Sequence, residues 1–351
     1  MSKTIYSIYD TAPKTEQIVA LLEQNNSPKL HLLGLVGSSI SFVIRSLFKK
    51  SEAPFLLILN DKEEAAYYLN DLEQMVGDQD VLFYPASFRR PYQIEETDNA
   101  NVLLRAEVLN RINSRKKPAI IVSYPEALFE KVVTRKELDK NTLKVAVGDQ
   151  ISIDFINEVL FEYEFKRVDF ITEPGEFSVR GGIVDVFSFS NDNPYRIEFF
   201  GNEVDSIRTF DVATQLSLEQ QKKIAIIPNV ENKFLQENRE SFLDYISEKT
   251  VLFIQNTEGL LSQLDKQFAK AEEAFETLSK DIKHATPEQL FLNQEQFVKR
   301  ALNFSVVELA SKPIFKTIKK FDFHTQPQPS FNKQFDLLLN NLNDNHFNGY
   351  K

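Results

Sequence analysis

Eight residues near the start of the chain have the spacing of a loop that binds nucleotide phosphates. The segment 34–41 reads Gly-Leu-Val-Gly-Ser-Ser-Ile-Ser and follows an apolar stretch. In a working loop, G-x-x-x-x-G-K-[ST], backbone amides surround the phosphates, a lysine reaches the β- and γ-phosphates, and the final hydroxyl binds Mg²⁺. The first glycine and the final hydroxyl of this pattern are present.

Two positions of this loop depart from the pattern. Ser39 stands where the second glycine belongs, and Ile40 stands where the lysine belongs. Without that cation the phosphates lose their main charge partner, and we expect the branched side chain of Ile40 to point into the space instead. We interpret the segment as a vestigial phosphate loop and predict that it holds no cofactor; its residues are Gly34, Gly37, Ser38, Ser39, Ile40 and Ser41.

Other catalytic patterns are missing from the sequence. No Asp-Glu dipeptide occurs, so the acidic motif that holds Mg²⁺ in helicase-type ATPases is absent. The four histidines are scattered, and there is no cysteine to form a thiolate metal site or a disulfide. We therefore predict no catalytic residue, no metal site and no enzymatic activity for this chain.

A second group of residues has the pattern of a protein-binding surface. In an extended segment 195–200, Tyr195, Ile197 and Phe199 share one face of a sheet. Arg196, Glu198 and Phe200 then share the other face. An exposed phenylalanine beside charged residues is typical of a binding hot spot, because aromatic and arginine side chains dominate interface energetics.

The alternative is structural. Phe200 would then cover the rim of a core, and Arg196 would pair with Glu198 or Glu203. Arg180 precedes two glycines, which permit a bulge or a close backbone approach that could direct the arginine sideways. From spacing alone, Arg180 is a solvated charge.

Three stretches of the sequence resemble a known domain. They are GEFSVRGGIVDVF, PYRIEFFGNEVDSIRTFD and the Thr-Gln pair at 214–215. They are similar to the middle domain shared by UvrB and the bacterial transcription-repair coupling factors, which in both families contacts the repair ATPase UvrA. The Phe-Phe-Gly-Asn-Glu and Arg-Thr-Phe-Asp-Val runs are closer to the coupling factors. The resemblance implies that Arg180, Arg196 and Phe200 contact UvrA.

The order of elements predicts the fold class. Strands at 30–36, 55–59, 81–83 and 119–122 alternate with helices at 61–75 and 98–112, which is the pattern of an α/β layer with a parallel sheet. A helix at 152–163 and short alternating strands follow. A strand at 251–255, helices at 258–278 and 287–301, and a strand at 304–309 then return to the first pattern.

Together with the resemblance, this order predicts three segments. Residues 1–141 form the first part of a degenerate, P-loop-NTPase-like and UvrB-like α/β platform. Residues 142–228 form an inserted, smaller α+β domain that binds UvrA, and residues 229–351 complete the platform. The resemblance covers essentially the whole chain and implies the N-terminal module of a longer protein, without the RNA-polymerase-binding domain and the DNA translocase.

Composition and charge restrict the partners and the location. The formal net charge is −10 at pH 7, and an acidic chain is a poor nonspecific DNA binder because affinity for DNA depends on neutralised phosphates. The start has no signal-peptide pattern, and no apolar run reaches the roughly 18 residues of a membrane span. We predict a cytoplasmic bacterial protein with no membrane partner.

The leading hypothesis is a noncatalytic adaptor of transcription-coupled repair. It would present Arg180, Arg196 and Phe200 to UvrA, so that repair proteins are recruited to stalled RNA polymerase. The family implies that the full-length protein is an ATP-dependent DNA translocase and that its C-terminal part masks this surface. It also implies that RNA polymerase and DNA bind to regions outside this chain. The alternatives are a UvrB-like ATP-dependent helicase that recognises damage, with the loop serines holding phosphates, and a clamp that contacts the rest of its own chain alone.

Overall fold

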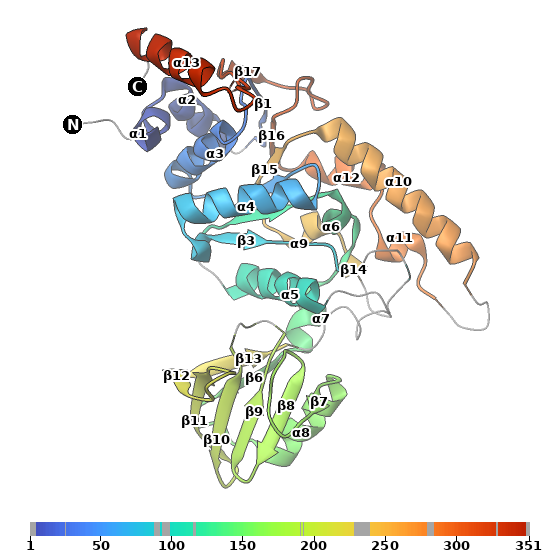
Figure 1. Ribbon diagram of the computed structural model, residues 1–351. Coiled ribbons are helices and arrows are strands. Elements are labelled where there is room, and N and C mark those ends of the chain that lie inside the picture. The colour runs from blue at the N-terminus through green and yellow to red at the C-terminus, as the bar shows by residue number, and fades with distance from the viewer. Residues whose placement is uncertain are drawn as a thin grey trace.

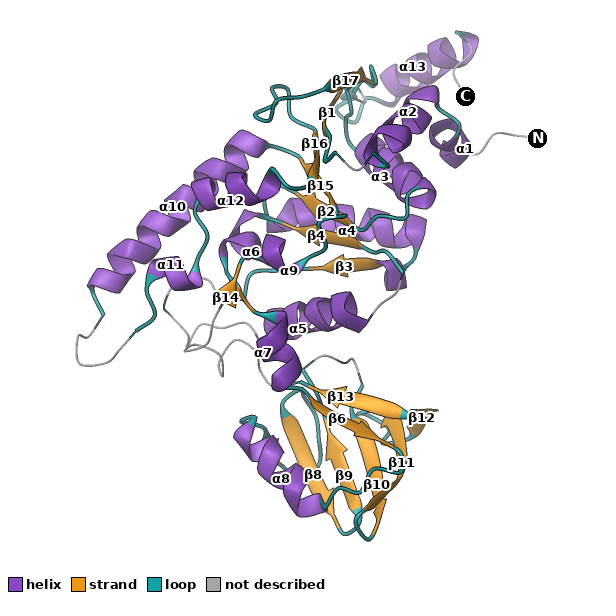
Figure 2. Cartoon of the chain, turned by 180° about the vertical axis from the view of Figure 1, so that it is seen from behind, coloured by secondary structure: helices purple, strands orange, loops and turns teal. Residues whose placement is uncertain are grey.

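The computed structural model describes residues 5–24, 26–87, 92, 99–114, 117–189, 191, 193–227, 239–278, 284–327 and 329–348. Two sheets organise this part of the chain. A parallel sheet with helices on both sides forms the larger body, the platform, and a second sheet projects from it as the insert (Figure 1). The view from behind shows the same two bodies joined through a narrow region (Figure 2).

The platform sheet contains seven strands from the described residues, and every neighbouring pair is parallel. The central strands are buried along their whole length, as expected for a parallel sheet covered on both faces. Its strands, in spatial order, are β17 (Lys319–Asp322), β1 (Lys29–Leu33), β16 (Ser305–Glu308), β15 (Val251–Ile254), β2 (Phe55–Ile58), β4 (Ile120–Ser123) and β3 (Val81–Phe83).

The platform helices bury apolar stripes and carry side-chain caps. In α3 (Ser39–Lys50), Ile40, Val43, Ile44 and Leu47 follow helical spacing and are all buried. Asp61 caps α4 (Lys62–Val76), and Asn256 caps α10 (Thr257–Glu276). The remaining helices are α1 (Ile5–Asp10), α2 (Pro13–Leu22), η1 (Asp78–Asp80), α5 (Asn99–Ser114), α6 (Pro125–Phe129), α7 (Arg135–Lys140), α9 (Phe242–Tyr245), α11 (Pro287–Leu290), α12 (Gln294–Ala301) and α13 (Phe335–Phe347).

The insert carries a six-stranded sheet of a different kind. Its strands are antiparallel except for the first pair. Their spatial order is β12 (Ser217–Gln220), β11 (Glu203–Phe210), β10 (Tyr195–Phe200), β9 (Ile183–Val186), β8 (Glu176–Arg180) and β7 (Lys166–Arg167). The predicted fold class, a parallel-sheet α/β platform with a smaller inserted α+β domain, is confirmed.

The two faces of the insert sheet are covered differently. Helix α8 (Ile153–Glu162) packs on one face through the buried side chains of Ile156 and Leu160, and the ring centroid of Phe161 lies 5.2 Å from that of Phe177. Because β7 and β8 are parallel, the connection between them must cross over the sheet. Ser178, which points away from α8, donates a hydrogen bond to the Asp169 carbonyl, so the crossover 168–175 lies on the opposite face.

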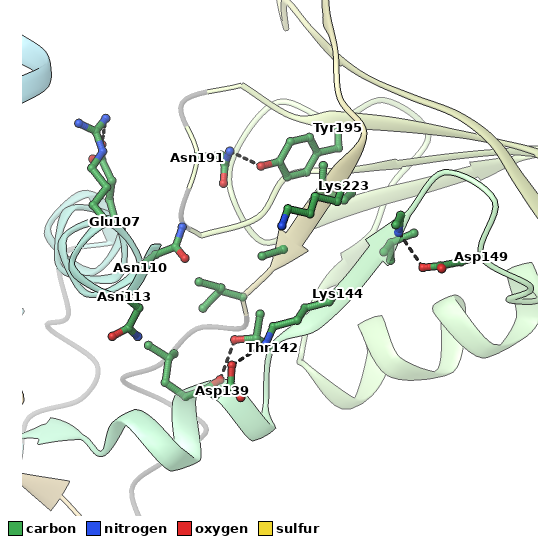
Figure 3. Close-up of a pocket in the computed structure, with 17 residues that line it drawn as sticks. Glu107, Asn110, Asn113, Asp139, Thr142, Lys144, Asp149, Asn191, Tyr195 and Lys223 are labelled. Carbon is green, nitrogen blue, oxygen red and sulfur yellow. Dashed lines mark hydrogen bonds and ion pairs between the residues drawn. The ribbon is translucent and has the colours of Figure 1, made fainter. Parts of the chain in front are cut away.

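Two short antiparallel ribbons lie where the insert joins the platform. One pairs β6 (Leu143–Ala146) with β13 (Lys223–Ile226), and the other pairs β5 (Val132–Val133) with β14 (Arg239–Glu240). A cleft of about 640 Å³ separates α5 from the first ribbon and from the start of β10, with Asp139 and Lys144 paired on its wall (Figure 3). The predicted end of the insert at 228 lies outside the described residues.

Several details differ from the sequence-based prediction. The helix predicted at 287–301 is wrong: α11 and α12 are separate because the Leu292 amide donates to the Phe129 carbonyl and Asn293 caps α12. Strand β17 was not predicted, since its sequence, KKFD, has no strand pattern. Strand β1 ends before Gly34, whose φ of +66° departs from extended backbone.

None of the helices in the described ranges combines the length and apolar character that a membrane span requires.

Candidate functional site

The vestigial loop lies between β1 and α3, at the carboxyl end of the parallel sheet, where phosphate loops occur in α/β proteins. Gly34 and Gly37 both adopt the left-handed backbone conformation, with φ of +66° and +55°. Gly34 also lies against the segment that follows β17. A Cβ atom at this position would come within 2.7 Å of both Asp322 Oδ1 and the His324 amide nitrogen.

The loop hydroxyls are hydrogen-bonded to other groups of the chain. Ser39 Oγ donates to the Val36 carbonyl at 2.7 Å and accepts from the Val36 amide at 2.8 Å. Ser41, the position of the Mg²⁺-binding hydroxyl, is fully buried and donates to Asp71 Oδ2 at 3.0 Å. Ser38 Oγ shares a 2.9 Å hydrogen bond with the Tyr67 hydroxyl. Each of the three serines therefore has a partner within the chain.

Ile40 does not fill the phosphate space, so that expectation is wrong. Its side chain is 6% exposed and belongs to the main core, because it continues the apolar stripe of α3. Thr325 instead binds the backbone of the loop. Thr325 Oγ1 donates to the Gly34 carbonyl at 2.6 Å and accepts from the Val36 amide at 3.0 Å, and the Thr325 amide donates to the same carbonyl at 2.7 Å.

A buried carboxylate at the end of a central strand was missed by the sequence reasoning. Glu308 ends β16 and is 1% exposed. It accepts hydrogen bonds from the Thr257 hydroxyl at 2.6 Å and from the amides of Ile314 and Phe315 at 2.8 and 3.0 Å. These bonds give it a structural role. Among the described residues, no group of three or more potential ligand side chains could hold a metal ion.

The face of the insert sheet opposite α8 forms the second candidate site. We call it the open face and define it by Arg180, Asp185, Arg196, Glu198, Phe200, Ser206 and Arg208. Strand β10 alternates as predicted: Tyr195 and Ile197 are buried, and Phe199 packs partly against the core. Phe200 is 84% exposed on the opposite side. The alternative in which Phe200 covers the rim of a core is therefore wrong.

The structure brings the two arginines together on one carboxylate. Asp185 on β9 lies directly opposite Arg196 on β10 and is 1% exposed. Arg196 donates to both carboxylate oxygens, from Nε at 2.7 Å and from Nη2 at 2.8 Å. Arg180 Nη2 donates to Asp185 Oδ2. Hydrogen bonding to Asp185 raises the pKa of Arg196, so the guanidinium group stays charged.

The partners that the structural alternative gives Arg196 are wrong for a geometric reason. Glu198 lies opposite Ser206 and accepts its hydroxyl at 2.7 Å, and it also pairs with Arg208. Glu203 accepts from the Gln150 side-chain amide at 3.0 Å. Arg196 also lies over the ring of the buried Phe210, with the guanidinium carbon 4.3 Å from the ring centroid. This stacking adds a cation–π contact that fixes the guanidinium plane.

Arg180 ends β8 and is followed by a tight turn. Gly181 and Gly182 form the two-residue loop of the β8–β9 hairpin, and Gly181 has the positive φ of +60° that such turns require. The backbone at Gly182 also lies close to β10, since a Cβ atom at this position would lie 3.1 Å from the Phe199 carbonyl oxygen. The Arg180 side chain is 40% exposed and paired with Asp185, so it is not only a solvated charge.

Phe200 shares the open face but not the cluster of arginines. It lies four residues beyond Arg196 on the same strand, which corresponds to roughly 13 Å of extended chain.

Sequence reasoning missed Asp185, although the alternation of Ile183 and Asp185 with Val184 and Val186 places that carboxylate on the same face. It also missed Phe170, which lies over Arg180 at 5.2 Å between the guanidinium carbon and the ring centroid.

Comparison with known proteins gives a family match for the insert. Residues 143–231 match the family model of the UvrB interaction domain. This range contains the β6–β13 ribbon and the whole six-stranded sheet.

The chain is also similar to several transcription-repair-coupling factors. The protein of Bacillus subtilis (strain 168) is 31% identical over 254 residues, which are 72% of this chain and 20% of that protein. The protein of Myxococcus xanthus is 30% identical over 213 residues, 59% of this chain and 18% of that protein. The protein of Escherichia coli (strain K12) is 27% identical over 198 residues, which are 56% of this chain and 17% of that protein. The match spans about a fifth of the length of these relatives.

The contact between Gly34 and the segment after β17 predicts a difference between two glycine substitutions. Gly37→Ala should lower the free energy of unfolding by about 1 kcal/mol, because alanine is strained at positive φ. Gly34→Ala should cost about 1–3 kcal/mol more, because its Cβ also collides with the segment after β17. Urea unfolding of both variants measures the difference. Equal losses would show that this segment does not pack against Gly34 in solution.

The shared carboxylate predicts a second difference. Asp185→Asn should lower the free energy of unfolding by about 3 kcal/mol, since it leaves two guanidinium groups without their buried partner. Glu198→Gln, on the same face but at an ion pair whose side chains are 29% and 30% exposed, should cost less than about 1 kcal/mol. Thermal and urea unfolding test both. A loss for Glu198→Gln as large as that for Asp185→Asn would contradict the central role of Asp185.

Proposed function

Because the chain is homologous to the N-terminal part of the transcription-repair coupling factors and contains a UvrB interaction domain, we propose that it is a noncatalytic adaptor of transcription-coupled nucleotide excision repair. Its insert binds UvrA through the open face. The binding recruits repair proteins to RNA polymerase that has stalled at a lesion. The protein acts in the bacterial cytoplasm.

One observation carries this proposal: an 84% exposed phenylalanine shares a sheet face with a pair of arginines held on a buried aspartate. Aromatic and arginine side chains are the types that dominate binding energy when a partner excludes water. Arg196 is held by Asp185 and Phe210, so little side-chain entropy is lost when a partner docks. Arg180 and Arg196 face carboxylates of UvrA, and Phe200 fills an apolar pocket.

The platform supports the insert without nucleotide chemistry. The loop serines and the Val36 amide are hydrogen-bonded within the fold, and Ile40 is in the core. A nucleotide would have to break these bonds and would find no lysine. Other parts of the full-length protein therefore drive translocation with ATP and bind RNA polymerase and DNA. A C-terminal part of that protein covers the open face until the translocase engages.

The proposal predicts loss of UvrA binding when Phe200 is truncated. Phe200→Ala should weaken binding at least about thirtyfold, the effect of removing an anchor worth roughly 2 kcal/mol. Phe335→Ala is the control, because this phenylalanine is 74% exposed but lies on α13 of the platform. Calorimetric titration into purified UvrA measures both, and Arg196→Ala should resemble Phe200→Ala.

Two results would contradict this prediction. Equal affinities of the wild type, Phe200→Ala and Arg196→Ala would show that the site is assigned to the wrong face. Absence of binding by the wild-type chain would favour a clamp that contacts the rest of its own protein.

The proposal also predicts that ATP has no effect on this chain. We expect no ATP turnover by this chain. A ligand that binds the folded state raises the melting temperature, so we also expect the melting temperature to stay the same at millimolar ATP and Mg²⁺. Ile40→Lys should not restore binding; it should destabilise the fold, because it places a charge in the core. ATP hydrolysis by the isolated wild-type chain would revive the UvrB-like helicase alternative.

A further inference from the structure

An exposed aromatic ring on the crossover 168–175 has no role in the proposed function so far. Phe170 is 64% exposed, and its ring lies against the Arg180 guanidinium. We propose that Phe170 is a further contact residue for UvrA and that it acts together with Arg180. This inference rests on the proposed function and names a second anchor within the same interface.

The position of the crossover places Phe170 at the border of the open face. Ser178 and Asp185 are paired across β8 and β9, so their side chains point to the same side of the sheet. Ser178 Oγ donates to the Asp169 carbonyl at 3.0 Å, which holds the residue before Phe170 on that side. Phe170 therefore extends the open face toward β8 and β7.

A continuous series of contacts connects Phe170 to the paired arginines. The Arg180 guanidinium carbon lies 5.2 Å from the Phe170 ring centroid, and its Nη2 donates to Asp185. Asp185 in turn holds Arg196. Without the ring, Arg180 would keep a single ion pair on a side chain that is 40% exposed. Phe170 thus contributes apolar area to the interface and restrains Arg180.

The spacing fits an interface with two aromatic anchors. Arg180 lies at the end of β8 and Phe200 at the end of β10, with β9 between them. Two strand separations correspond to roughly 10 Å. A standard interface contributes about 800 Å² from each partner, so both positions fit within a single contact area.

The crossover is rigid enough to present the ring. The next residue, Ile171, is 2% exposed and packs with Phe187 and Phe210. The Thr172 amide, the Thr172 hydroxyl and the Glu173 amide all donate to Glu176 Oε2, at 2.7, 3.0 and 3.1 Å. Burial alone would raise the pKa of Glu176, but these hydrogen bonds outweigh it and lower the pKa, so the carboxylate stays ionised at neutral pH. Little ordering cost remains for binding.

The charge of the open face defines the chemistry of the partner surface. Arg180 and Arg196 share one carboxylate, whereas Arg208 has Glu198 to itself. The residues that define the open face therefore carry one net positive charge, in a chain whose formal net charge is −10. The complementary surface carries a carboxylate for Arg180 next to an apolar patch for Phe170.

A double-mutant cycle on the whole 351-residue chain tests this inference. UvrA affinity is measured by calorimetry for Phe170→Ala, Arg180→Ala and the double variant. We expect about a tenfold loss for Phe170→Ala, since a contact residue contributes more than about 1 kcal/mol. The loss of the double variant should be smaller than the product of the two single losses, because the two side chains act together. The melting temperature of Phe170→Ala should stay unchanged, because its ring is mostly exposed.

Phe155→Ala is the matched control. Phe155 is 48% exposed on α8, on the opposite side of the insert sheet, and this variant should bind like the wild type. Wild-type affinity for Phe170→Ala, multiplicative losses in the double variant, or an equal loss for Phe155→Ala would overturn the inference while the proposed function stands. No binding by the wild-type chain, by contrast, would overturn the proposed function and this inference with it.

Discussion

The fold depends on a parallel sheet that neither end of the chain can complete alone. Strands β16 and β15, which follow the insert, lie between β1 and β2, which precede it. Each of these four strands obtains a hydrogen-bonding neighbour from the other side of the insert. The two segments of the platform must therefore associate, and this association brings both ends of the insert together at the paired strands β6 and β13. The hydrogen bonds of the six-stranded sheet, by contrast, all lie within the insert.

This division assigns different tasks to the two bodies. The platform uses its polar groups internally: Ser39 and Ser41 bond to neighbouring groups, and Glu308 receives two backbone amides and a hydroxyl. The insert leaves large apolar and charged groups at its surface, but it fixes them. Asp185 orients two guanidinium groups, Phe210 supports one of them, and Phe170 supports the other. A face held this way can recognise a partner with little rearrangement.

Sequence alone was sufficient for the features that depend on local periodicity. The period of two in β10 placed Arg196 and Phe200 on the exposed side, and the order of strands and helices gave the fold class. Features that depend on pairing between segments distant in the sequence could not be predicted from it. The partner of Arg196 depends on the register between β9 and β10, and Phe170 depends on the path of a crossover. Likewise, the loop pattern predicts Ile40 in the phosphate space because it compares positions only, whereas the packing of α3 on the sheet decides the direction of this side chain.

The β6–β13 ribbon also determines how mechanical load would pass through the molecule. The chain enters the insert along β6 and leaves it along β13, and Leu143 is paired with Ile226 at the platform end of the ribbon. A force that draws the insert away from the platform therefore stretches two covalent backbones side by side. It does not peel their hydrogen bonds apart. Any load on the insert therefore reaches the platform through these two adjacent strands, which carry it along their covalent backbones.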